Sequence, residues 1–92
     1  MEIIKQDTKV DKHGMVFRIV KTENKELPYT VEHSPLNNDG TYNTEDFSIL
    51  GGTVGYSTSE FKTEEEARSF FNDAINLTNE EMADKYPSIW VL

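Results

Sequence analysis

The chain has 92 residues and a formal net charge of -8, and it contains no cysteine. A chain of this length has no room for a second hydrophobic core, so we expect one domain spanning residues 1–92. The composition excludes disulfides, thiolate metal sites and a cysteine nucleophile, and the acidic charge disfavours free nucleic acid and anionic lipid as direct partners.

The first half of the chain has the alternating pattern of β-strands. Apolar side chains recur at every second position in short runs, which is the period of a strand with one buried face. The predicted strands are residues 3–10, 15–20, 27–33, 47–50 and 53–58. Turn-forming residues separate the first two strands at positions 11–14, and Asn38-Asp39-Gly40 predicts a turn inside the polar loop 34–46. Pro28 predicts a strand start or a sheet edge.

Two helices are predicted in the second half, each after a threonine that is followed three residues later by glutamate. This spacing is a capping box, in which the threonine hydroxyl and the glutamate carboxylate satisfy free backbone amides. The first helix follows Thr63 and spans residues 64–76. Its apolar stripe consists of Ala67, Phe70, Phe71, Ala74 and Ile75. The second helix follows Thr78 and ends near Tyr86, because Pro87 cannot continue it.

Strands followed by helices predict an α+β fold. We expect an antiparallel sheet of about four to five short strands, with one amphipathic helix packed on one face and a short C-terminal helix. The apolar tail, residues 89–92, is expected to pack on the core or to add an edge strand. No apolar run is long enough for a signal peptide or a membrane span. Together with the lack of cysteine, this predicts a cytoplasmic protein with no membrane partner.

No motif with catalytic or cofactor-binding chemistry is found. The loop around Asp39 has only a faint likeness to a calcium loop, since Pro35 stands where the first ligand would be. The glycines of residues 51–55 lack the lysine and the following helix of a phosphate-binding loop. His13 and His33 are too few for a zinc site. We therefore expect no enzymatic activity, no cofactor and no metal site.

Charge is segregated along the chain. The first 25 residues hold six of the nine basic side chains, whereas no lysine or arginine occurs between Glu26 and Phe61. Acidic residues in the first turn of a helix complement the helix dipole, but those on strands and in the long loop have no such local role. Glu32 is expected to be exposed, because it lies on the strand face opposite Val31. The candidate partner-binding residues are Glu32, Asp39, Glu45, Asp46, Glu60, Glu64 and Glu65.

These features favour a small acidic inhibitor that binds a basic protein. Ordinary surfaces intersperse both signs of charge, and carboxylates can occupy a nucleic-acid-binding site as phosphates do. In size and charge the chain resembles the anti-restriction and anti-CRISPR proteins of phages and mobile elements. This resemblance implies a nuclease or another nucleic-acid-binding effector as partner, blocked by acidic mimicry. No direct binding of nucleic acid is expected, and the protein is expected to be a monomer or a homodimer.

Two alternative functions are considered. The first is a structural or regulatory interaction module, joined to a partner or a second copy through the apolar tail or a strand edge. The second follows from the element order and from the segment FKTEEEA, residues 61–67, which resemble the sheet-plus-helix arm-binding domains of phage integrases. That resemblance implies DNA contact through the basic residues Lys5, Lys9, Lys12, Arg18 and Lys21.

Overall fold

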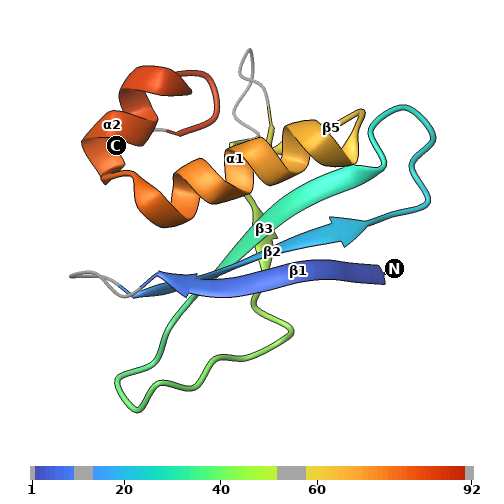
Figure 1. The fold of residues 1–92 in the computed structure, drawn as a ribbon. Coiled ribbons are helices and arrows are strands. Elements are labelled where there is room, and N and C mark those ends of the chain that lie inside the picture. The colour runs from blue at the N-terminus through green and yellow to red at the C-terminus, as the bar shows by residue number, and fades with distance from the viewer. Residues whose placement is uncertain (1, 10–13, 52–57, 91–92) are drawn as a thin grey trace.

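The computed structural model describes residues 2–9, 14–51 and 58–90, and Figure 1 shows its fold. The strands are β1 (Glu2–Lys9), β2 (Met15–Lys21), β3 (Tyr29–Pro35), β4 (Ser48–Ile49) and β5 (Glu60–Phe61), and the helices are α1 (Glu64–Asn76) and α2 (Asn79–Lys85). The expected α+β class is confirmed. The turn predicted at 11–14 lies outside the described residues except for Gly14. No helix in the described part of the chain has the length and apolar character needed to cross a membrane.

The sheet is antiparallel, and its last position is filled by two short strands. β1, β2 and β3 pair in the order of the chain. β4 and β5 then pair with the remaining edge of β3, with Ile49 opposite Glu32 and Phe61 opposite Tyr29. Because both run antiparallel to β3, they form one edge strand that is interrupted after β4.

Ser59 closes this interruption. Its fully buried hydroxyl donates to the Val31 carbonyl over 2.6 Å, and the Val31 N–H donates to the Ser59 carbonyl over 2.9 Å. The backbone of β3 therefore stays hydrogen-bonded across the gap. The sequence predicts a strand at 53–58 instead. Of that range the structure describes Thr58, which bridges to Gly51, and the other positions lie outside the described residues.

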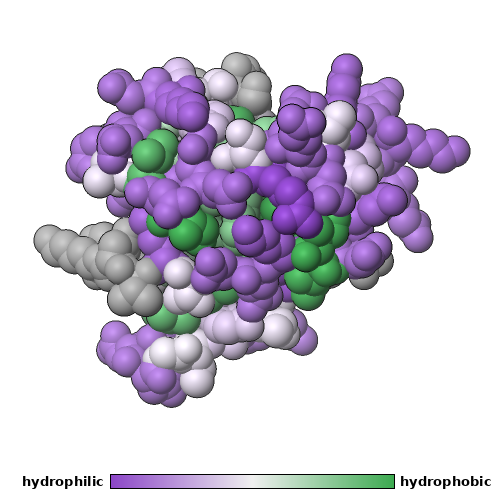
Figure 2. Space-filling model, viewed as in Figure 1, coloured by the Kyte–Doolittle hydropathy of each residue, from purple (hydrophilic) through white to green (hydrophobic). Residues whose placement is uncertain are grey.

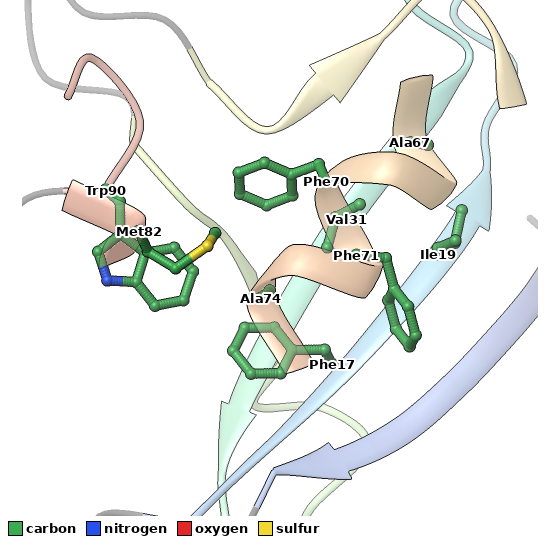
Figure 3. Packing of buried hydrophobic residues seen from close by; sticks show 9 residues of the cluster. All are labelled: Phe17, Ile19, Val31, Ala67, Phe70, Phe71, Ala74, Met82 and Trp90. Atoms are coloured by element: carbon green, nitrogen blue, oxygen red, sulfur yellow. The ribbon is translucent and has the colours of Figure 1, made fainter. Parts of the chain in front are cut away.

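The hydrophobic core lies between the sheet and α1, which crosses one face of it (Figure 1). Figure 3 shows the buried residues of this cluster, which are Phe17, Ile19, Val31, Ala67, Phe70, Phe71, Ala74, Met82 and Trp90. The predicted helical stripe is confirmed, with Ile75 partly buried at its margin. Trp90 is 8% exposed and stacks on Phe17 with ring centroids 5.9 Å apart. The tail therefore packs on the core at Trp90, whereas residues 91–92 lie outside the described range.

Both predicted helix starts are confirmed, with one difference in detail. At α2 the capping box is complete, since Thr78 and Glu81 each accept the other's backbone N–H through a side chain. At α1 the Thr63 hydroxyl accepts the Glu66 N–H over 3.2 Å. The Glu66 carboxylate accepts from the Thr63 hydroxyl over 3.0 Å rather than from the backbone. At the start of α1, only the threonine half of the predicted capping box is therefore formed.

Asp73 joins the end of α1 to the end of α2. Its carboxylate pairs with the Lys85 ammonium over 2.7 Å and accepts a hydrogen bond from the Tyr86 hydroxyl. These contacts, with Lys85 first, lower the pKa of Asp73 below its ordinary value of 3.8. Burial and the same carboxylate raise the pKa of Tyr86 to about 12. A carboxyl whose folded-state pKa is lowered stabilises the fold above its ordinary pKa and loses that contribution as pH falls.

Asp73→Asn is expected to lower the thermal unfolding midpoint at neutral pH, because an amide cannot form the ion pair with Lys85. As pH falls below 3.8 the unfolded chain is protonated first and the native carboxyl only at lower pH, so the difference between native protein and variant shrinks over this range. Circular dichroism melts across this pH range measure the difference. Asp84→Asn, at an exposed position of α2, is the control and shows no such pH-dependent gap. A gap for Asp73→Asn that stays constant with pH contradicts the ion-pair role.

Candidate protein-binding surface

The loop of residues 36–47, which connects β3 to β4, lies on the face of the sheet opposite α1 (Figure 1). Strand alternation turns a second set of β2 and β3 side chains toward this face. The buried members of the set are Val16, Arg18, Val20, Thr30 and Ser34. α1 therefore covers one face of the sheet, and the loop contacts the other face at Arg18 and Gln6.

Arg18 is the central contact between the sheet and the loop. Its Nε donates to Glu32 Oε1 over 2.9 Å, and its guanidinium lies 3.8 Å from the ring centroid of Phe47. The Arg18 and Glu32 side chains are only 8% and 16% exposed. A charge with so little water contact needs a partner, and the Phe47 ring adds a cation–π contact on the guanidinium.

The expectation that Glu32 is exposed is wrong. It lies on the predicted strand face, but that face is covered because the loop folds back over it. The carboxylate is directed to Arg18, its cross-strand neighbour in the β2–β3 register. The ion pair with Arg18 therefore accounts for the position of Glu32, and no contact with another protein is needed to explain it.

The rest of the loop is held by contacts of its own. Tyr42 packs edge-on against Phe47 with centroids 5.8 Å apart, and its hydroxyl accepts a hydrogen bond from Gln6 of β1. The predicted turn is confirmed, with Gly40 at φ 85°, where a side chain would be strained. Asp39 accepts the hydroxyl and the backbone N–H of Thr41, and these bonds lower the pKa of Asp39.

The structure divides the predicted acidic residues into two groups. Exposed carboxylates of the loop form the first group, which is Asp39, Glu45 and Asp46. The second group lies at the junction of β5 and α1: Glu64 and Glu65 belong to the helix, on the other side of the sheet, whereas Glu60 is paired with Thr30 on the face that the loop contacts. Glu60 accepts from the Thr58 hydroxyl over 2.9 Å, and Glu64 pairs with Arg68 over 2.8 Å, so Glu65 is the freely exposed member. The loop carboxylates and the acids at the start of α1 therefore form two separate groups.

The basic residues of the first hairpin are mostly engaged within the chain. The Lys5 ammonium lies 5.2 Å from the Phe71 ring centroid. Lys9 donates to the Leu77 carbonyl, and Arg18 pairs with Glu32 as described. Lys21 is exposed, with its ammonium 5.9 Å from the Tyr29 ring centroid, and Lys12 lies outside the described residues. Four of the five side chains that would contact DNA in an arm-type domain therefore have partners in their own chain.

His33 has a packing role. Its ring stacks on Phe17 with centroids 6.4 Å apart, and its Nδ1 lies 3.0 Å from the Ser48 carbonyl oxygen. Burial lowers the pKa of His33. Within residues 2–9, 14–51 and 58–90, no group of three or more His, Cys, Asp or Glu side chains is placed to hold a metal ion.

Sequence reasoning missed the two residues that position the acidic loop, Tyr42 and Phe47. The only signal for them is the presence of two aromatic side chains in or next to a segment that is otherwise polar. Large aromatic rings are seldom left in water, and a loop that carries them packs against its neighbours. Comparison of the chain with known proteins identifies no family: no protein-family model, no curated protein and no solved structure matches it.

Glu32→Ala is expected to lower the free energy of unfolding by about 3 kcal/mol, because it leaves a buried guanidinium unpaired. Glu45→Ala, at an exposed position, is the matched control and changes it by about 0.5 kcal/mol or less. Urea unfolding of both variants measures the difference. A double variant, Arg18→Met with Glu32→Leu, is expected to recover most of the loss, since it removes both charges together. Equal effects of Glu32→Ala and Glu45→Ala contradict the structural role.

Proposed function

We propose that this protein binds a basic protein through the loop 36–47 and thereby inhibits a nucleic-acid-binding effector. One observation carries the proposal: Asp39, Glu45 and Asp46 are exposed on a loop that is fixed to the sheet by Phe47 and Tyr42. No lysine or arginine occurs in the chain between Glu26 and Phe61 to offset these carboxylates.

The anchoring of the loop matters for affinity. A flexible acidic segment must lose conformational freedom when it binds, and this cost reduces the net binding energy. The contacts of Phe47 with Arg18 and of Tyr42 with Gln6 order the loop before any partner arrives. The carboxylates can therefore attract a basic surface over a long range and bind it with little further ordering.

The class of partner is argued from charge. A net charge of -8 on 92 residues repels phosphates and attracts proteins whose working surface is basic. Surfaces of that kind bind nucleic acid, so a bound acidic protein excludes the nucleic acid from the same site. The similarity in size and charge to anti-restriction and anti-CRISPR proteins supports a nuclease as the target. Inhibition, rather than binding alone, requires that the two ligands compete.

Glu45→Lys with Asp46→Lys is expected to weaken binding by about tenfold or more, because attraction to a basic surface becomes repulsion at two positions. The matched control is Glu80→Lys with Asp84→Lys, which changes the net charge equally at exposed positions of α2. All three proteins are immobilised and used to capture nucleic-acid-binding proteins from a bacterial lysate. The target is retained by the native protein and the control, and it is lost with the loop variant.

Two further measurements separate mimicry from simple association. The retained target is expected to be released by added DNA or RNA, since both occupy one site. Retention is also expected to fall steeply between low and physiological salt, where the screening length shortens to about 8 Å. Capture of the same proteins by all three baits, or retention unaffected by nucleic acid, rules the proposal out.

A further inference from the structure

Strand β1 leaves one long edge of the sheet open. Among the described residues it pairs only with β2, and its eight residues, Glu2–Lys9, include no proline. The opposite edge of the sheet is covered by β4 and β5. An unpaired edge presents a row of free N–H and C=O groups, which a further strand can complete.

The neighbouring surface favours strand pairing over apolar docking. Figure 2 shows the face that carries β1 and α1, on which hydrophobic surface is confined to small patches between hydrophilic side chains. Ile3, 51% exposed, is the large apolar residue of this strand that contacts water. Such small patches do not hold a partner by apolar burial alone, whereas backbone hydrogen bonds along an edge do not need them.

The charges along β1 identify the strand that fits. Lys5 and Asp7 lie two residues apart, opposite Ile19 and Phe17 of β2, so both lie on the α1 side of the sheet. Asp7 is exposed and its carboxylate accepts the Thr8 backbone N–H over 2.7 Å, a bond that a paired strand would replace, and Lys5 is half-buried. Because the two charges are opposite in sign, a second β1 strand running antiparallel can present Asp7 to Lys5 and Lys5 to Asp7.

Register decides whether this match occurs. Successive backbone groups point to opposite edges, so two copies of one strand can pair symmetrically only about a residue and not about a peptide bond. Pairing about Lys5 places two lysines opposite each other, and pairing about Asp7 places two aspartates opposite each other, both unfavourable. Pairing about Gln6 places Lys5 opposite Asp7 twice. Pairing about Thr8 would place Asp7 opposite Lys9, whose ammonium already donates to the Leu77 carbonyl of its own chain, so the register about Gln6 is preferred.

We propose that β1 pairs antiparallel with β1 of a second copy in the register centred on Gln6, which gives a symmetric dimer with one continuous sheet. A β-bulge between Ile3 and Lys5 interrupts the regular register toward the start of the strand. The bulge limits the new ladder to the middle of β1 and so restricts which strands the edge accepts. This inference does not depend on the partner of the acidic loop.

Charge exchange tests the register. Asp7→Lys creates two Lys–Lys contacts and Lys5→Glu creates two acid–acid contacts, so each variant is expected to raise the dimer dissociation constant at least tenfold. Mixing the two variants restores opposite charges at both positions, and a heterodimer forms. Sedimentation velocity from about 1 to 500 μM, a range suited to weak interfaces, measures both results. Circular dichroism confirms that each variant is folded.

Single cysteines give a second readout, because the native chain contains none. Gln6→Cys places two thiols opposite each other at the symmetry axis, where side chains approach closely enough for a disulfide. Thr8→Cys, exposed on the same strand, faces position 4 of the other copy and is the matched control. Mild oxidation is expected to give a covalent dimer with Gln6→Cys and a much smaller yield with Thr8→Cys.

Three outcomes overturn the proposal. The first is a native protein that stays monomeric at every concentration. The second is a dimer that is unaffected by either charge variant, because its interface then lies elsewhere. The third is equal cross-linking at positions 6 and 8, since the register is then not centred on Gln6. The cysteine measurement remains decisive if Lys5→Glu fails to fold.

Discussion

The buried guanidinium of Arg18 is the group on which both the sheet and the acidic loop depend. With a side chain only 8% exposed, this charge is stable in the fold only when it is paired. The register of β2 and β3 places Glu32 opposite it, and the ring of Phe47 lies on the guanidinium. The Arg18 guanidinium therefore links the β2–β3 pair to the loop 36–47 that follows β3.

Coverage of both sheet faces follows from the same arrangement. All residues from Val16 to Val20 are buried, alternately toward α1 and toward the opposite face, where Arg18 contacts Phe47 of the loop 36–47. A domain of 92 residues has little chain with which to enclose a core. Covering the second face with a connecting loop extends burial without another helix, and it holds the loop carboxylates in a defined place.

Sequence patterns predicted the parts of the fold that depend on local spacing. The capping boxes and the apolar stripe predicted both helices, and the alternation of apolar and polar side chains predicted the first three strands. These signals lie within a few residues of one another in the sequence. The interrupted edge strand was not predictable, since it depends on the Ser59 hydroxyl reaching Val31, far away in the chain. Alternation correctly assigned Glu32 to a face but contained no information on what covers that face. For the same reason the acidic residues that form one set in the sequence lie on two sides of the sheet.

The basic and acidic side chains of this molecule differ in their contacts as well as in their positions along the sequence. Lys5, Lys9 and Arg18 contact rings, a carbonyl or a carboxylate of their own chain, whereas the acids of the loop face water. The surface around the loop 36–47 is therefore more uniform in sign than a residue count of the whole chain indicates. Symmetric pairing about Gln6 keeps each side chain on its own face of the extended sheet, so both helices α1 lie on one side and both acidic loops on the other. Two weak contacts to one extended basic surface would then act together, and a partner with such a surface would gain affinity without any new contact in either copy.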